Sequence, residues 1–105
     1  MTTFPLRIIT PEGSVFATPV ESLVAPGIQG SFGVMARHAP MISALQQGVL
    51  KVETGGATRL FVIADGVLEI DRGEVIVMTG SATAVAGKAE ADRELKKLLD
   101  GETEV

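Results

Sequence analysis

The sequence has no cysteine, no tryptophan and no tyrosine, and it has one histidine, His38. Without cysteine, disulfides and thiolate metal sites are excluded. A zinc site would have to combine His38 with carboxylates alone, so no metal site is expected. The only aromatic side chains are four phenylalanines, whereas hydrophobic residues make up 46% of the chain. The core is therefore expected to be mostly valine, leucine, isoleucine and alanine.

Long apolar runs and blocks of basic residues are also missing. No run approaches the roughly 20 residues that span a bilayer, and the N-terminus lacks a signal-peptide pattern. The net charge of −4 makes nucleic acid a poor partner. At 105 residues the chain is long enough for one domain. We expect a soluble protein made in the cytoplasm, with no nucleic-acid partner and no direct membrane insertion.

Turn signals separate short apolar runs along most of the chain. Phe4, Leu6 and Ile8 alternate with polar or turn-forming residues, which is typical of a strand with one buried face. The turns are expected at Pro11-Glu12-Gly13, Thr54-Gly55-Gly56-Ala57 and Asp71-Arg72-Gly73-Glu74. Pro19 is expected to break or bulge a long strand from Ser14 to Ala25. The pattern predicts a mainly β fold, an antiparallel β-sandwich of roughly 8–10 short strands followed by one short C-terminal α-helix.

The apolar period changes after Gly87. Apolar residues then recur at helical spacing, at Ala91, Leu95, Leu98 and Leu99. We expect a helix from Lys88 to Asp100 that stops at Gly101, with a sandwich domain over residues 1–86 and a helix with a tail over residues 87–105. Because so short a helix is marginal alone, its leucine face should rest on the sandwich or on a partner.

The stretch Gly30–Pro40 lies between two apolar runs and holds two glycines, the histidine and a proline. We interpret it as a docking loop, because binding groups concentrate in loops on rigid scaffolds. Gly27, Gly30 and Gly33 form G-x-x-G-x-x-G, which is not the dinucleotide fingerprint, and no phosphate-loop ending follows. Nucleotide phosphate binding is therefore not expected here.

A catalytic reading would combine Ser31 or Ser43 with His38 and Asp65 into a small hydrolase. No Gly-x-Ser-x-Gly elbow supports it. A second alternative is a free-standing sandwich that binds proteins and homodimerises. From the residues alone, the sequence predicts a small β-sandwich with a short helix that acts as a binding module.

Five segments, in order, resemble the epsilon subunit of F-type ATP synthases. They are Leu6–Gly13, Val20–Gly27, Gly30–Val34 with His38–Pro40, Leu45–Leu50 and Ala64–Ile70. The resemblance covers residues 4–86. It implies a non-catalytic rotor subunit of the central stalk that links the gamma subunit to the c-ring and helps couple proton or sodium translocation to ATP synthesis. It also implies a monomer in isolation and a peripheral location at the cytoplasmic face of the bacterial inner membrane.

The resemblance assigns contacts residue by residue. Gln29, Gly30, Ser31 and Phe32 fall on the loop that meets the c-ring, and Thr10, His38 and Ser43 fall on the side toward gamma. Ser31 stands where family members often carry an acidic residue.

The C-terminus departs from the family pattern. Members commonly carry two helices there, which in many bacteria can block ATP hydrolysis, and some bind ATP through Ile/Leu-Asp-x-x-Arg-Ala. Only one helix fits here, and Ala91-Asp92-Arg93-Glu94 does not match that motif. We therefore expect no cofactor, no ATP binding and no hairpin-type inhibition. Contact of the helix with the alpha and beta subunits is the alternative to its packing on the sandwich.

Overall fold

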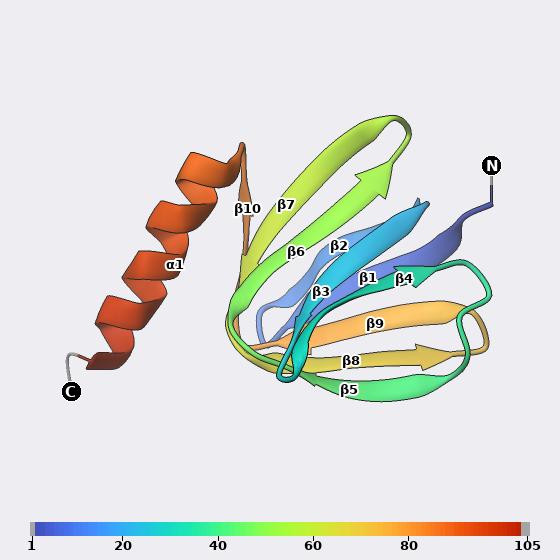
Figure 1. Ribbon diagram of the computed structural model, residues 1–105, viewed down its shortest axis with the longest axis horizontal. Helices are drawn as coiled ribbons and strands as arrows, with labels where there is room; N and C mark the ends of the chain where they lie inside the picture. Colours follow the sequence, from blue (N-terminus) through green and yellow to red (C-terminus); the bar gives the residue numbers. More distant parts are fainter. Residues whose placement is uncertain (1, 104–105) are drawn as a thin grey trace.

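A computed structural model describes residues 2–103 as ten strands and one helix (Figure 1). The strands are β1 (Phe4–Thr10), β2 (Gly13–Val20), β3 (Ser22–Gly27), β4 (Gly30–Met35), β5 (Met41–Leu45), β6 (Gly48–Thr54), β7 (Ala57–Ile63), β8 (Gly66–Asp71), β9 (Glu74–Thr79) and β10 (Ala82–Val85). The helix α1 spans Lys88–Thr103. The predicted class, a mainly β sandwich with a C-terminal helix, is confirmed.

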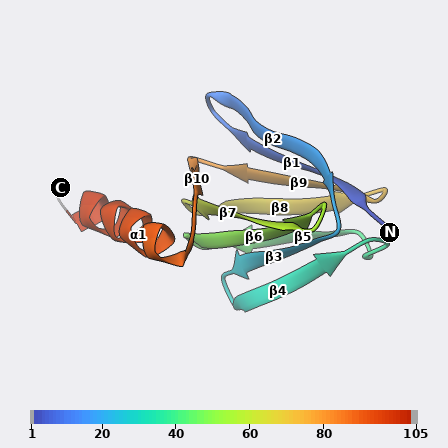
Figure 2. The same ribbon diagram turned by 90° about the horizontal axis from the view of Figure 1, so that it is seen from above.

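The strands follow one hydrogen-bonded path in the order β10-β7-β6-β3-β5-β8-β9-β1-β2, with β4 added to β3. This path folds over itself into two layers, one of β5, β8, β9, β1 and β2, and one of β4, β3, β6, β7 and β10 (Figure 2). All pairings are antiparallel except β1 with β9, which is parallel. The predicted antiparallel β-sandwich is therefore confirmed, with this one parallel pair among the described strands.

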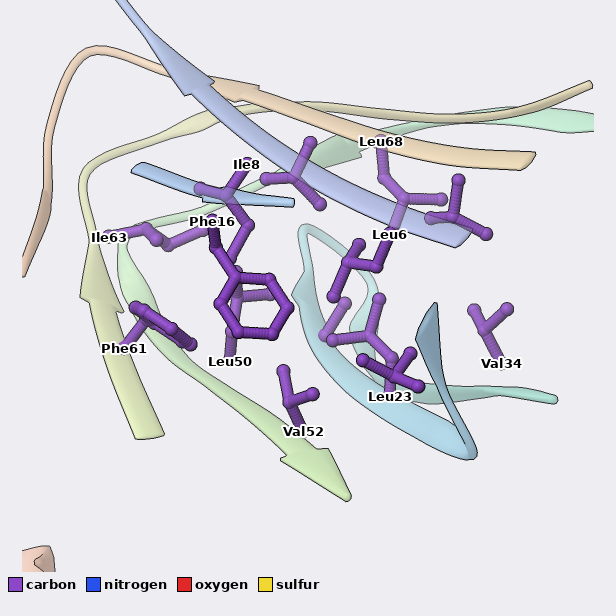
Figure 3. Close-up of a cluster of buried hydrophobic side chains, with 14 of the residues drawn as sticks. Leu6, Ile8, Phe16, Leu23, Val34, Leu50, Val52, Phe61, Ile63 and Leu68 are labelled. Atoms are coloured by element: carbon purple, nitrogen blue, oxygen red, sulfur yellow. The ribbon is translucent and has the colours of Figure 1, made fainter. Parts of the chain in front are cut away.

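The core lies between the two layers and is mostly aliphatic, with the phenylalanines Phe4, Phe16 and Phe61. Leu6, Ile8 and Leu68 from one layer face Leu23, Leu50 and Val52 from the other (Figure 3), and all six are fully buried. The two aromatic core residues that face each other, Phe16 and Phe61, pack edge to face with ring centroids 5.3 Å apart. Burying interdigitated side chains at near-crystalline density makes such a sandwich stiff.

The predicted hairpin turns form where positive φ angles are needed. Gly55 and Gly56 have φ values of 58° and 81°, and Arg72 and Gly73 have values of 53° and 80°. Positive φ at both central positions defines a type I′ turn, which matches the twist of the flanking strands. Sequence alone was sufficient to place these turns.

Pro19 does not break its strand, so that expectation was wrong. β2 continues to Val20, and Pro19 pairs opposite Pro5 on β1. β2 is an edge strand with β1 on one side only. A proline there leaves the hydrogen bonds to β1 intact when its nitrogen, which has no hydrogen to donate, faces the free side of the strand. The strand ends at Val20 instead, and the next N–H, that of Glu21, donates to the Glu53 carbonyl at 2.8 Å. The register between β2 and β1 shifts opposite Ile8 and Ile9.

The helix begins as predicted but extends further. Glu90 accepts a hydrogen bond from the Ala86 N–H at 3.0 Å, so its carboxylate helps to cap the helix start. Gly101 does not end the helix, which runs to Thr103. A glycine without another helix-stopping residue costs only about 1 kcal/mol in a helix interior, so the helix can pass through it.

The helix contacts β7 and β10 at one end of the sandwich, and it projects away from the strands (Figure 2). Ala91 and Val62 are both buried, although neither belongs to the main core, so they form the contact between helix and sheet. Farther along, Leu95 and Leu98 are half-buried and Leu99 is 53% exposed. The leucine face therefore rests on the sandwich only through its first turns.

Candidate interaction surfaces

The stretch predicted as a docking loop is mostly a strand. The turn consists of Ile28 and Gln29 alone, and Gly30–Met35 forms β4, which pairs with the whole of β3. The prediction of a loop was wrong here, because glycines at positions 30 and 33 of an edge strand look like turn signals in the sequence. The true loop is the short segment from Ala36 to Pro40.

A groove lies between the β3–β4 turn and β5. We call it the β4–β5 groove; it has a volume of about 580 Å³ and is lined by Gly27, Ile28, Gln29, Gly30, Ser31, Phe32, Ile42, Ser43 and Ala44. All four residues predicted to meet the c-ring line it, and so does Ser43 from the set predicted to face gamma. The structure therefore brings together parts of two contacts that the sequence assigned separately.

Phe32 and Gly27 fix the shape of the closed end of this groove. A Cβ atom on Gly27 would lie 2.9 Å from the Phe32 ring and 2.7 Å from the Gly30 carbonyl oxygen. The ring thus lies directly over Gly27, and it also packs against the core. Phe32 is a structural side chain as well as a candidate contact.

The three residues predicted to face gamma do not form one cluster. Thr10 is buried at the end of β1, where its Oγ1 accepts a hydrogen bond from the Glu12 N–H at 3.2 Å. His38 lies beyond the opposite end of the sheet, just before β5, and Ser43 lies in the middle of β5. β1 and β5 run in the same direction, so Thr10 and His38 are separated by at least the length of β5, roughly 17 Å.

His38 makes a local contact. Its Nδ1 lies 2.9 Å from the Ala39 carbonyl oxygen, which can only accept a hydrogen bond, so Nδ1 carries the proton. This bond fixes the turn before β5. Asp65 lies next to Gly66, which pairs with Leu45 at the far end of β5, so the hydrolase arrangement of Ser43, His38 and Asp65 does not assemble.

The outer face of the five-stranded layer carries an exposed apolar surface that the sequence interpretation missed. We call it the outer patch; it consists of Ile9, Ile42, Ala44, Val67, Ile76 and Met78. The register places Ala44, Val67, Met78 and Ile9 side by side in one row across four strands. Ile42 is 72% exposed, Met78 is 43% exposed and Val67 is 37% exposed. Adjacent exposed apolar side chains make this surface a candidate for a protein contact.

Charged groups lie within and beside the outer patch. Glu69 lies between Ile42 and Ile76 in the register, and Arg7, next to Ile76, pairs with Glu74 at 2.9 Å. Within residues 2–103, no group of three or more histidine or acidic side chains is close enough to hold a metal ion. No helix in that range is long and apolar enough to cross a membrane. Exposed apolar side chains with a few charged groups among them are common in protein interfaces.

Comparison with known proteins agrees with the fold. The profile of the family described as "ATP synthase, Delta/Epsilon chain, beta-sandwich domain" matches residues 3–85. The chain is 40% identical over 96 residues to the ATP synthase epsilon chain of Campylobacter curvus, covering 90% of this chain and 73% of that one. It is 37% identical over 86 residues to the epsilon chain of Rhodopseudomonas palustris, covering 82% of this chain and 64% of that one.

Solved structures show the same fold at lower identity. A chain in the Euglena gracilis mitochondrial ATP synthase superposes with a TM-score of 0.76 at 21% identity, over 99% of this chain and 68% of that one. A chain in the central stalk and c-ring structure of the Tetrahymena thermophila mitochondrial ATP synthase gives 0.67 at 10% identity, over 90% of this chain and 89% of that one. The predicted resemblance is confirmed, and this chain belongs to the ATP synthase delta/epsilon family, as an epsilon chain.

Proposed function

We propose that this epsilon chain works in an ATP synthase as a stiff, non-catalytic adaptor of the central stalk that links the gamma subunit to the c-ring. In this role it helps to couple proton or sodium translocation to ATP synthesis. Its membership of the epsilon family supports the role in the complex. The close-packed aliphatic core supports the mechanical part, because a poorly compressible sandwich transmits torque without deforming.

The outer patch is the main observation that supports a contact with gamma. Its exposed side chains come from four adjacent strands of a rigid sheet, and α1 contacts β7 and β10 in the other layer. Burying Ile42, Val67 and Met78 would remove apolar area that the isolated chain leaves in water. The Arg7–Glu74 pair at one side of the patch and Glu69 between Ile42 and Ile76 would give the contact its orientation.

The turn end of the β4–β5 groove is the proposed contact with the c-ring. Ile28 and Gln29 form the turn, and Gly30, Ser31 and Phe32 follow it on β4. None of these side chains is charged, so this contact should depend on shape and neutral hydrogen bonds. A peripheral place at the cytoplasmic face of a bacterial inner membrane follows from binding the ring in this way.

The gamma contact is testable with two variants of matched exposure. Met78 on the outer patch is 43% exposed, and Val24 on the other layer is 39% exposed. Met78→Glu places a charge in the centre of the proposed interface, and should weaken binding of the purified chain to gamma at least about tenfold. Val24→Glu should leave the affinity within about twofold of the natural chain.

The measurement is the dissociation constant by calorimetry, with melting curves to show that both variants are folded. Equal affinities for the two variants would place gamma on another face. The role in coupling is measured by reconstituting the rotary enzyme with and without this chain. ATP synthesis per translocated ion should fall when the chain is left out, and unchanged coupling would contradict the adaptor role.

A further inference from the structure

We propose that the free edge of β5 is a strand-addition site, at which an extended, uncharged segment of the gamma subunit pairs with Ile42 and Ala44. The inference rests on the proposed function and specifies how that partner binds. In strand addition, a partner segment extends an existing sheet through main-chain hydrogen bonds. The contact would thus combine the outer patch with backbone pairing at its border.

The pairing of β5 is asymmetric. On one edge it pairs with β8 over its full length, from Met41 to Leu45. On the other edge, the only described strand partner is β3, which pairs through Gly27 with Leu45 and then turns away. Most of this second edge is therefore left without a neighbouring strand in the described chain.

The last bond on that second edge identifies which backbone groups face outward. The Ile28 N–H donates to the Ala44 carbonyl at 3.1 Å, so the polar backbone groups of Ala44 point away from β8. In an antiparallel ladder, successive residues direct these groups to opposite edges, so those of Ile42 point the same way as those of Ala44 and those of Ser43 point toward β8. Because the Ala44 carbonyl already accepts from Ile28, the open backbone groups of this edge within the described chain are the N–H and C=O of Ile42 and the N–H of Ala44.

The groove beside this edge has room for a strand. Ile42 and Ala44 form one wall of the β4–β5 groove, and Gly30 and Ser31 on β4 form the other. β4 and β5 are not paired with each other, and the groove between them has a volume of about 580 Å³. An added strand would continue the sheet at the point where β3 leaves it.

The lack of ionisable side chains in the groove indicates what kind of segment could bind there. None of its nine lining residues is ionisable, although the chain carries nine basic and thirteen acidic residues. A charged segment would lose hydration there without gaining an ion pair, so the occupant should be neutral. Ile42 and Ala44 also belong to the outer patch, and this continuity assigns the segment to gamma.

Amide hydrogen exchange tests the pairing without any substitution. In the free ¹⁵N-labelled chain, the Ser43 amide should exchange slowly because it faces β8, whereas the Ile42 and Ala44 amides should exchange rapidly. In the complex with gamma, the Ile42 and Ala44 amides should slow at least about tenfold. Unchanged rates for both in a saturated complex would overturn the inference. Protection that appears in the free chain as its concentration rises would also overturn it, because a second copy would then occupy the edge.

Two substitutions at one position separate backbone pairing from side-chain burial. Ile42→Ala shortens the side chain and keeps the N–H, whereas Ile42→Pro also removes the N–H, which an edge strand tolerates. Ile42→Pro should bind gamma at least about tenfold more weakly than Ile42→Ala, with both spectra showing a folded chain. Equal affinities refute strand addition and leave the proposed function standing. Failure of the natural chain to bind gamma refutes the proposed function itself.

Discussion

Leu68 and Val67 are neighbours in β8 whose side chains point to opposite faces, so replacing each by alanine separates the core from the proposed interface. Leu68 is fully buried, and Val67 is 37% exposed in the outer patch. Leu68→Ala removes three carbons from a close-packed site. At about 0.8 kcal/mol per buried methylene plus the cost of the cavity, it should lower the free energy of unfolding by about 2–4 kcal/mol.

Val67→Ala should have a smaller effect on stability and a larger one on binding. It removes two carbons that are already partly in water, so the loss should be about 1 kcal/mol. For a domain of this size, the two values correspond to falls in melting temperature of roughly 8–32 °C and 4–8 °C. At a temperature where both variants are folded, only Val67→Ala should weaken binding to gamma.

Calorimetric melting measures the first effect, and titration of each folded variant with gamma measures the second. Equal destabilisation by the two substitutions would refute the assignment of opposite faces. A stable Leu68→Ala variant that fails to bind gamma would show that Leu68 acts in the interface. Either result would contradict the sandwich packing on which both candidate surfaces depend.

Two further predictions concern close packing and cofactors. Gly66→Ala should lower the free energy of unfolding by about 1–3 kcal/mol, measured by chemical denaturation, because its Cβ would meet the Met78 carbonyl oxygen and the Thr79 backbone. The control is Gly80→Ala, whose Cβ would have no atom within 4 Å. Equal losses for the two variants would contradict the close approach at Gly66. Titration with ATP should show no binding at micromolar concentrations, since Ala91, the first residue of the segment nearest to the ATP-binding motif, is buried. Micromolar binding would overturn the expectation of no cofactor.

The fold was predictable because its local signals are strong. Each hairpin turn needed residues that tolerate positive φ, and Gly55-Gly56 and Arg72-Gly73 supplied them at the expected places. The helix start was predictable from the change in apolar period after Gly87. Its end was not, because a single glycine is a weak stop when tertiary contacts do not oppose the helix.

The β4–β5 groove could not be read from the sequence, because it depends on where β3 changes partner. β3 pairs with β6 at Ser22–Val24 and with β5 only at Gly27, and this switch leaves the rest of the β5 edge open. No local pattern encodes such a change, since the pairing joins segments far apart in the chain. The four ring-contact residues stay a prediction, as do Thr10, His38 and Ser43.

The outer patch did leave a signal in the sequence, and it lies in strands that are apolar at every position. Leu60–Ala64 and Val75–Met78 are both continuous apolar runs, which indicate that both faces of a strand are covered. In β7 the second face is covered by α1, where Ala91 meets Val62. No described element covers the second face of β9, where Met78 stays exposed. The same pattern thus has two physical causes, and the strand that lacks an internal cover is the one that should meet a partner.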